Sequence, residues 1–114
     1  MEYVEVPLSD LASGKVIPIP VLYNTRKVTA LVLQHAEDVA VYLDLCPHAR
    51  TELSTNGNYL SEDKARIMCE VHGATFKLDD GSCDRGPCKG ETLAKIPFEL
   101  ASDIVRVPKQ LAPQ

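Results

Sequence analysis

The sequence predicts an all-β protein made of many short antiparallel strands. Apolar and polar residues alternate in several runs, as between residues 39 and 45, and this period of two is typical of strands. Turn signals such as Asn56-Gly57 separate the runs. No convincing long helix is present. A chain of 114 residues with 45% hydrophobic residues fits a single domain, residues 1–114.

The first half of the chain contains four strand-like runs. The second run carries Pro18 and Pro20, which cannot donate to a ladder, so we expect this strand at the edge of a sheet. The third run is apolar and β-branched, which predicts a buried strand. A turn-rich connection or a single helical turn is expected at residues 8–14. The expected strands are residues 3–7, 16–22, 28–34 and 39–45, with polar turns at 24–27 and 35–38.

The second half opens with a polar stretch, residues 47–64, and continues with shorter strands. Asp79-Asp80-Gly81 is a turn signal. Residues 83–90 contain glycine and proline and predict a loop, and the tail from residue 108 is expected to be loose. The expected strands are residues 65–68, 74–78, 93–100 and 104–107, with a polar turn at 101–103 between the last two.

The composition argues against several classes of function. The formal net charge is −4 and Lys and Arg are scattered, so we expect no nucleic-acid binding. No apolar run has the length that spans a bilayer, and the acidic N-terminal residues lack the features of a signal peptide. We therefore expect a soluble protein of the cytoplasm with no membrane partner. In that reducing compartment, four cysteines favour metal or redox chemistry over disulfides.

Two short motifs each combine one cysteine with one histidine. Cys46-Pro47-His48 follows the expected strand 39–45, and Cys69-Glu70-Val71-His72 follows the expected strand 65–68. The plain alternative is two buried cysteines and two unrelated histidines. Two of the three histidines, however, lie within three residues of a cysteine. Since thiolate and imidazole are good metal ligands, the four residues predict a metal centre.

A single zinc ion and a two-iron cluster both use such ligands. Zinc accepts two thiolates and two imidazoles, typically with two to four residues inside each pair. Only Pro47 separates Cys46 from His48, and it stiffens the pair, so closing both side chains on one ion would be strained. In a His-ligated [2Fe-2S] cluster, neighbouring residues reach neighbouring irons. The spacing therefore favours the cluster and leaves zinc as the weaker alternative.

The motifs Cys46-Pro47-His48 and Cys69-x-x-His72-Gly73 resemble the two cluster loops of Rieske iron–sulfur proteins. The gap between the motifs is somewhat longer than the common form, and a hairpin at Asn56-Gly57 can absorb it. The likeness continues at residues 76–81, at Gly86-Pro87, and at residues 96–99 and 104–107.

This resemblance implies the Rieske fold, an antiparallel β-sandwich or barrel-like base with a small cluster-binding subdomain. The base would comprise residues 1–44 and 77–114, and the subdomain would comprise residues from about 45 to 76. By the same resemblance, one [2Fe-2S] cluster would have its inner iron on Cys46 and Cys69 and its outer iron on His48 and His72. An exposed imidazole edge would then shorten the path of an electron to a docked protein.

The resemblance also implies a low-potential cluster. High-potential members, in cytochrome bc complexes, carry an additional cysteine in each loop, whereas this chain has Ala49-Arg50-Thr51 and Glu70-Val71. Those members also place hydroxyl donors at the positions held here by Ala74 and Phe76. Fewer donors stabilise the reduced cluster less, which lowers the potential.

The histidine count indicates a carrier rather than an oxygenase. A mononuclear iron site needs two more histidines and a carboxylate, and only His35 remains. The resemblance implies a one-electron carrier between a flavin-dependent reductase and a terminal oxygenase or similar redox enzyme, and a monomer is the default expectation for a carrier of this size. The alternatives are an accessory small subunit of a larger reductase, such as a nitrite reductase, and a zinc-stabilised interaction module. We interpret Cys83 and Cys88 as small buried residues in preference to a redox pair or second metal half-site.

Overall fold

In the computed structural model, the chain folds almost entirely into β-strands. The structure describes residues 3–11, 15–23, 26–35, 38–45, 53, 59–61, 66–69, 73–86 and 89–111. Within these ranges, no helical segment combines the length and the apolar character that crossing a bilayer requires. The elements are β1 (Tyr3–Pro7), a 3-10 turn η1 (Leu8–Leu11), β2 (Val16–Tyr23), β3 (Arg26–His35), β4 (Asp38–Leu43), β5 (Arg66–Met68), β6 (Thr75–Lys77), β7 (Cys83–Arg85), β8 (Glu99–Ala101), β9 (Ile104–Pro108) and β10 (Gln110–Leu111).

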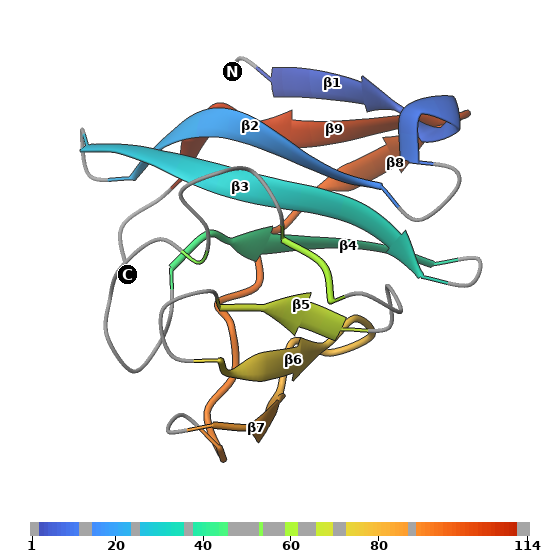
Figure 1. Cartoon of the computed structure of the whole chain (residues 1–114). Coiled ribbons are helices and arrows are strands. Elements are labelled where there is room, and N and C mark those ends of the chain that lie inside the picture. The colour runs from blue at the N-terminus through green and yellow to red at the C-terminus, as the bar shows by residue number, and fades with distance from the viewer. Residues whose placement is uncertain are drawn as a thin grey trace.

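The strands form three sheets that lie one after another along the molecule. The first sheet has the order β1-β9-β8, the second β10-β2-β3-β4, and the third β5-β6-β7. Figure 1 shows the third sheet at the end opposite β1 and β9, with β3 and β4 in between. The predicted all-β class is confirmed. The division into a base and a subdomain at residues 44/45 and 76/77 stays a prediction.

β3 contributes to both hydrophobic cores of the molecule. Successive side chains of a strand point to opposite faces, so Ala30 and Val32 lie on one face and Leu31 and Leu33 on the other. All four are at most 2% exposed. Because both faces are buried, the strand has no polar alternation, which explains the continuous apolar run in the sequence.

The two cores differ in composition. The base core lies between the first and second sheets and is aliphatic throughout. The small-sheet core lies between the second and third sheets and includes three aromatic side chains and two cysteines. The base core comprises Val6, Leu11, Ile19, Val21, Ala30, Val32, Val41, Ile96, Val105 and Val107. The small-sheet core comprises Leu31, Leu33, Tyr42, Leu53, Tyr59, Ile67, Cys69, Ala74, Phe76, Cys83 and Leu93.

Among the described residues, no strand pairs with Pro18 or Pro20 on the side of β2 away from β3, although β2 is not the outermost strand of its sheet. β2 pairs with β3 along its whole length. On its other side, β10 pairs in parallel with Leu22 and Tyr23. The expectation of a loose tail is thereby corrected for Gln110 and Leu111, which form β10. A strand of only two residues is too short to show the period of two by which strands are predicted from the sequence.

Two further sequence predictions were wrong. Residues 83–85, expected in a loop, form β7 against β6, because Cys83 packs into the small-sheet core and the pairing partner is distant from any local pattern. Residues 93–98, expected as a strand, make no continuous ladder, and Lys95 forms one isolated antiparallel bridge with Tyr42 of β4. Leu93 N–H donates to Gly81 and Ile96 N–H donates to Val41, each at 2.9 Å. Pro97 has no N–H, so no ladder continues there.

The remaining differences concern strand ends. β3 is longer than the expected 28–34 because its polar ends also pair, including His35 with Asp38 across the β3–β4 turn. The expected strand 39–45 ends at Leu43, and the chain bends at Asp44. The Asn56-Gly57 turn lies outside the described residues.

Candidate metal centre

The second cysteine motif begins directly after β5. Cys69 follows Met68, the last residue of β5, and its side chain is fully buried at 0% exposure. The other three predicted ligands, Cys46, His48 and His72, lie outside the described residues. Among the residues that the structure does describe, no group of three or more His, Cys, Asp and Glu side chains is placed to hold a metal ion.

The turn after Cys69 is closed by two backbone hydrogen bonds. The Cys69 N–H donates to the carbonyl of Ala74 at 2.8 Å, and the Gly73 N–H donates to the carbonyl of Cys69 at 2.9 Å. Gly73 has a φ of +66°, which glycine adopts without strain. By sequence, His72 belongs to this same turn between β5 and β6. The hairpin therefore holds the two ends of the second motif together.

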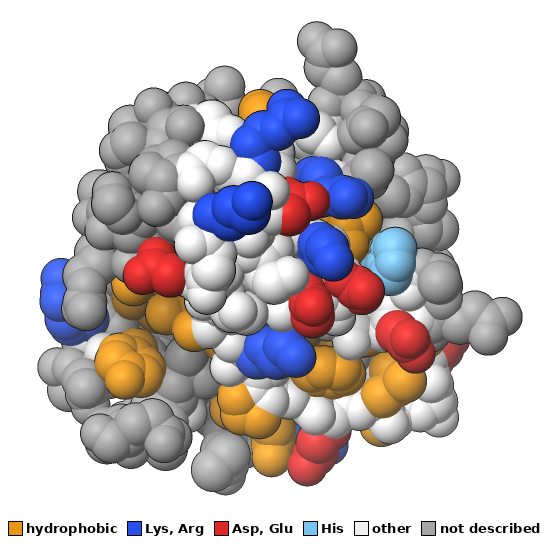
Figure 2. All heavy atoms as spheres, turned by 90° about the horizontal axis from the view of Figure 1, so that it is seen from below, with side chains coloured by type: hydrophobic (Ala, Val, Ile, Leu, Met, Phe, Trp, Pro, Cys, Tyr) orange, Lys and Arg blue, Asp and Glu red, His pale blue; other side chains and the backbone are white. Residues whose placement is uncertain are grey.

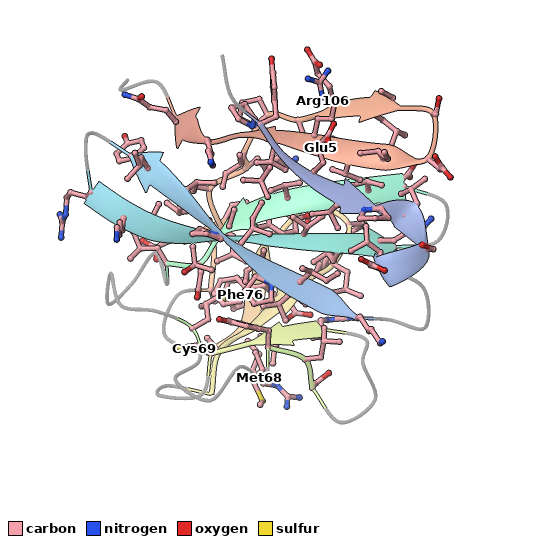
Figure 3. All side chains as sticks on the ribbon, turned by 90° about the horizontal axis from the view of Figure 1, so that it is seen from above. Glu5, Met68, Cys69, Phe76 and Arg106 are labelled. Atoms are coloured by element: carbon pink, nitrogen blue, oxygen red, sulfur yellow. The ribbon has the colours of Figure 1, made fainter. Side chains whose placement is uncertain are left out.

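The surroundings of Cys69 are apolar. Ala74 and Phe76 are both fully buried in the same core, and neither side chain carries a hydroxyl. The third loop begins against this hairpin, since a Cβ added to Gly86 would lie 2.7 Å from the Cα of Ala74. Pro87 lies outside the described residues. Figure 3 shows Cys69, Met68 and Phe76 on the side of the molecule opposite Glu5 and Arg106.

The first motif follows a buried carboxylate. Asp44 is 3% exposed, and its N–H donates to the carbonyl of Thr29 on β3 at 2.8 Å. The backbone N–H of Leu53 donates to Asp44 Oδ1 at 2.8 Å. By sequence, Cys46 and His48 lie between these two residues. The hydrogen bond therefore brings together both ends of the segment that contains the first motif.

One tyrosine connects the two motifs. The hydroxyl of Tyr59 donates to Asp44 Oδ2 at 3.1 Å, and its carbonyl accepts the N–H of Met68 at 2.9 Å. Met68 directly precedes Cys69. Sequence reasoning missed Asp44 and Tyr59, although a charged residue inside the apolar alternation, two positions before Cys46, was a signal that could have drawn attention to Asp44.

A second carboxylate joins the three strands of the small sheet. Asp84 on β7 accepts the Thr75 hydroxyl from β6 at 2.6 Å and the Arg66 Nε–H from β5 at 2.8 Å. The hydrogen bond from Thr75 and then that from Arg66 hold the pKa of Asp84 below its usual value. These partly exposed bonds lie across all three short strands and keep them in register.

Cys83 and His35 have the surroundings of structural residues. Cys83 is 6% exposed within the small-sheet core, and its thiol donates to the carbonyl of Arg85 at 3.2 Å. This burial agrees with its interpretation as a small core residue. His35 is exposed at the end of β3. Cys88 lies outside the described residues.

The donor set fits an iron–sulfur cluster on the evidence of Cys69. A thiol that is fully buried among apolar side chains, at the end of a strand and on a closed hairpin, can bind a metal as a thiolate shielded from water. The apolar surroundings also favour a centre of low net charge. Cys69 is the one predicted ligand that the structure describes, and the ligand set as a whole stays a prediction.

Comparison with protein families gives one match. The model of the Rieske [2Fe-2S] domain matches residues 1–108 of this chain. No curated protein matches the chain.

Several solved structures share the fold. The ferredoxin of carbazole 1,9a-dioxygenase from Nocardioides aromaticivorans IC177 is 19% identical with a TM-score of 0.67, covering 95% of this chain and 98% of that chain. The chain from a complex of reduced oxygenase and oxidized ferredoxin in carbazole 1,9a-dioxygenase is 20% identical with a TM-score of 0.69, at 98% and 97% coverage. The terminal oxygenase of carbazole 1,9a-dioxygenase from Novosphingobium sp. KA1 is 20% identical with a TM-score of 0.70, and the match covers 99% of this chain and 31% of that chain.

Proposed function

Because the chain belongs to the Rieske [2Fe-2S] domain family, we propose that it is a one-electron carrier and not an enzyme in itself. The observation that carries this proposal is the family match over residues 1–108, which includes both ligand motifs. The cofactor of this domain is one Rieske-type [2Fe-2S] cluster. When bound, the cluster supplies reversible one-electron chemistry.

In this proposal, Cys46 and Cys69 bind one iron, and His48 and His72 bind the other. The burial of Cys69 supports its assignment, because the apolar residues around it exclude water from a thiolate. The closed β5–β6 hairpin supports His72, which lies on the same turn by sequence. Ala74 and Phe76 offer no hydroxyl donor, so the potential lies in the lower half of the Rieske range.

The proposed partners are a terminal oxygenase or similar redox enzyme, as electron acceptor, and a flavin-dependent reductase, as donor. The fold shared with a chain from a complex of reduced oxygenase and oxidized ferredoxin supports this choice. Figure 2, viewed from the β7 side, shows Lys and Arg interspersed with Asp and Glu rather than a patch of one sign. Such a surface favours reversible, salt-sensitive docking by a monomer in the cytoplasm.

The cluster is tested by purifying the protein without exposure to oxygen or chelators. We expect a reddish-brown protein with about two irons and two acid-labile sulfides per chain. A redox titration should place its potential in the lower half of the Rieske range. A colourless protein with one zinc would overturn the cluster and favour the interaction module.

The role as a carrier is tested by identifying its partners in cell extracts. A free carrier should exchange between a reductase and an oxygenase, with binding that weakens as salt is added. Co-purification in a fixed ratio with a large reductase would overturn the free carrier and favour the accessory subunit.

A further inference from the structure

We infer that Asp44 and Tyr59 form a clasp that holds the two ligand loops at a fixed separation, which makes them positioning residues for the cluster. The inference rests on the proposed function, because it assigns the ligand motifs on both sides of the clasp. Neither residue is itself a proposed ligand. Their role follows from what their polar atoms contact.

The first half of the clasp is the Asp44 carboxylate. Its backbone is attached to β3 through the Thr29 carbonyl, which places the side chain at the base of the first motif. One carboxylate oxygen accepts the Leu53 N–H at 2.8 Å and closes the segment that contains Cys46 and His48. Asp44, just after β4 ends, therefore fixes Leu53 relative to the start of this segment.

The second half of the clasp is Tyr59. Its side chain donates to the other Asp44 oxygen at 3.1 Å, while its own carbonyl accepts the Met68 N–H at 2.9 Å. Tyr59 therefore bonds at one end to Asp44, two positions before Cys46, and at the other end to Met68, which directly precedes Cys69. Tyr59 is 6% exposed, so water competes little for these bonds.

The chemistry of Asp44 is more than packing requires. A buried carboxylate is costly unless several donors satisfy it, and an apolar residue could fill the same volume in a core that is otherwise mainly apolar. Both Asp44 oxygens accept donors from the chain around the two motifs. We interpret the carboxylate as the group that relates the two loops to each other.

Tyr42 provides a matched control for Tyr59. It is also a buried tyrosine of the small-sheet core, 1% exposed, and its hydroxyl donates to a carbonyl, that of Leu78, at 2.8 Å. Leu78 lies in the turn after β6 and not in a ligand loop. Tyr42→Phe and Tyr59→Phe therefore remove the same atom from similar surroundings, but only Tyr59→Phe opens the clasp.

The first measurement is the rate of iron release from the loaded protein to a chelator. We expect Tyr59→Phe to release iron about tenfold faster than Tyr42→Phe, as for other residues that orient metal ligands. The electron paramagnetic resonance spectrum of the reduced Tyr59→Phe protein should also shift, because the two histidine-bearing loops would no longer be held at their wild-type separation. Equal release rates and unchanged spectra would overturn the inference.

Asp44→Asn provides a second variant that keeps the size of the side chain. It retains one acceptor for Leu53 and loses the charge, so we expect faster release than in wild type and slower release than in Asp44→Ala. Circular dichroism must show the strand content of wild type in each variant. Release as slow in Asp44→Ala as in wild type would also overturn the clasp.

The second measurement uses the cluster-free protein and separates this inference from the proposed function. Amide hydrogen exchange at Leu53 and Met68 should be about fivefold faster in Tyr59→Phe than in Tyr42→Phe, the factor expected for one net hydrogen bond. Equal exchange rates would overturn the clasp even if wild type holds a cluster. If the wild-type protein binds no iron, the proposed function is overturned. The exchange rates would then test only whether Tyr59 connects the two loops.

Discussion

The base and the small sheet are stabilised in different ways. The base is formed by strands of up to ten residues and has an aliphatic core. Its ion pairs lie at the surface, where Arg106 contacts Glu5 at 3.5 Å and Glu99 at 3.6 Å. Such exposed pairs contribute about 0–1 kcal/mol each. The small sheet has strands of three residues and depends on polar side chains that bond across segments, including the buried Asp44.

This difference shows how a small domain keeps a stable body and a precisely arranged site. Apolar burial stabilises the base without fixing fine geometry, because dispersion and the hydrophobic effect have little directionality. Hydrogen bonds are directional, and the buried carboxylate of Asp44 accepts two of them, from Leu53 and Tyr59, at the end that holds Cys69. Substitutions in the two regions should therefore have different effects on the free energy of unfolding and on the binding of iron.

The largest expected effect comes from the two buried cysteines. Cys69→Ala should abolish the cluster, with iron falling to near zero, while the strand content of the base persists in circular dichroism. Cys83→Ala is the matched control, and it should keep its iron because Cys83 belongs to neither ligand motif and its thiol donates to the Arg85 carbonyl within β7. Loss of iron from both variants alike would break the distinction between ligand and core cysteine.

The next effect compares one side chain from each core. Phe76→Ala should cost about 3–5 kcal/mol in the free energy of unfolding and should also speed iron release, because Phe76 packs in the core that contains Cys69. Val105→Ala in the base should cost about 2 kcal/mol and leave iron release unchanged. Urea unfolding and chelator kinetics measure the two quantities, and Phe76→Leu gives a milder variant if Phe76→Ala does not fold.

A smaller effect concerns pH at the junction of the two regions. Burial, followed by the charges of Asp80 and Asp79, raises the pKa of Tyr42 from 10.0 to about 12. A tyrosine with a raised pKa favours the folded state below its unfolded pKa and loses that contribution as pH rises. Wild type should therefore lose about 2–3 kcal/mol between pH 10 and 12 that Tyr42→Phe does not lose. Parallel pH profiles of unfolding free energy would contradict this.

The smallest effect distinguishes two glycines with nearly the same backbone. Gly86 has a φ of +103° and Gly90 a φ of +97°, so alanine at either should cost about 1–2 kcal/mol of backbone strain. Only at Gly86 does the new Cβ meet backbone, 2.7 Å from Ala74, whereas Gly90 has open space. Gly86→Ala should also shift the spectrum and potential of the cluster, and Gly90→Ala should not.

The sequence was most informative where a strand is long or a ligand motif is distinctive. The expected strand at residues 3–7 coincides with β1, and the apolar run at 28–34 lies within β3. Strands as short as β7 and β10 were missed because their pairing depends on partners that are distant in the sequence. The run from residue 93 failed for the opposite reason, since it has the alternation of a strand but pairs with β4 only through one isolated bridge, between Lys95 and Tyr42.

The sequence by itself determined the chemistry that is possible here. Two Cys–His motifs, a single residue inside the first, and the absence of hydroxyl donors at Ala74 and Phe76 were all readable without coordinates. Only the tertiary structure decided what arranges that chemistry. Asp44, Tyr59 and Met68 span 25 positions of the chain, and they are connected because Tyr59, buried in the small-sheet core, bonds to both of the others. A local sequence pattern does not predict such a contact, because the contact becomes favourable only after the segments have packed together.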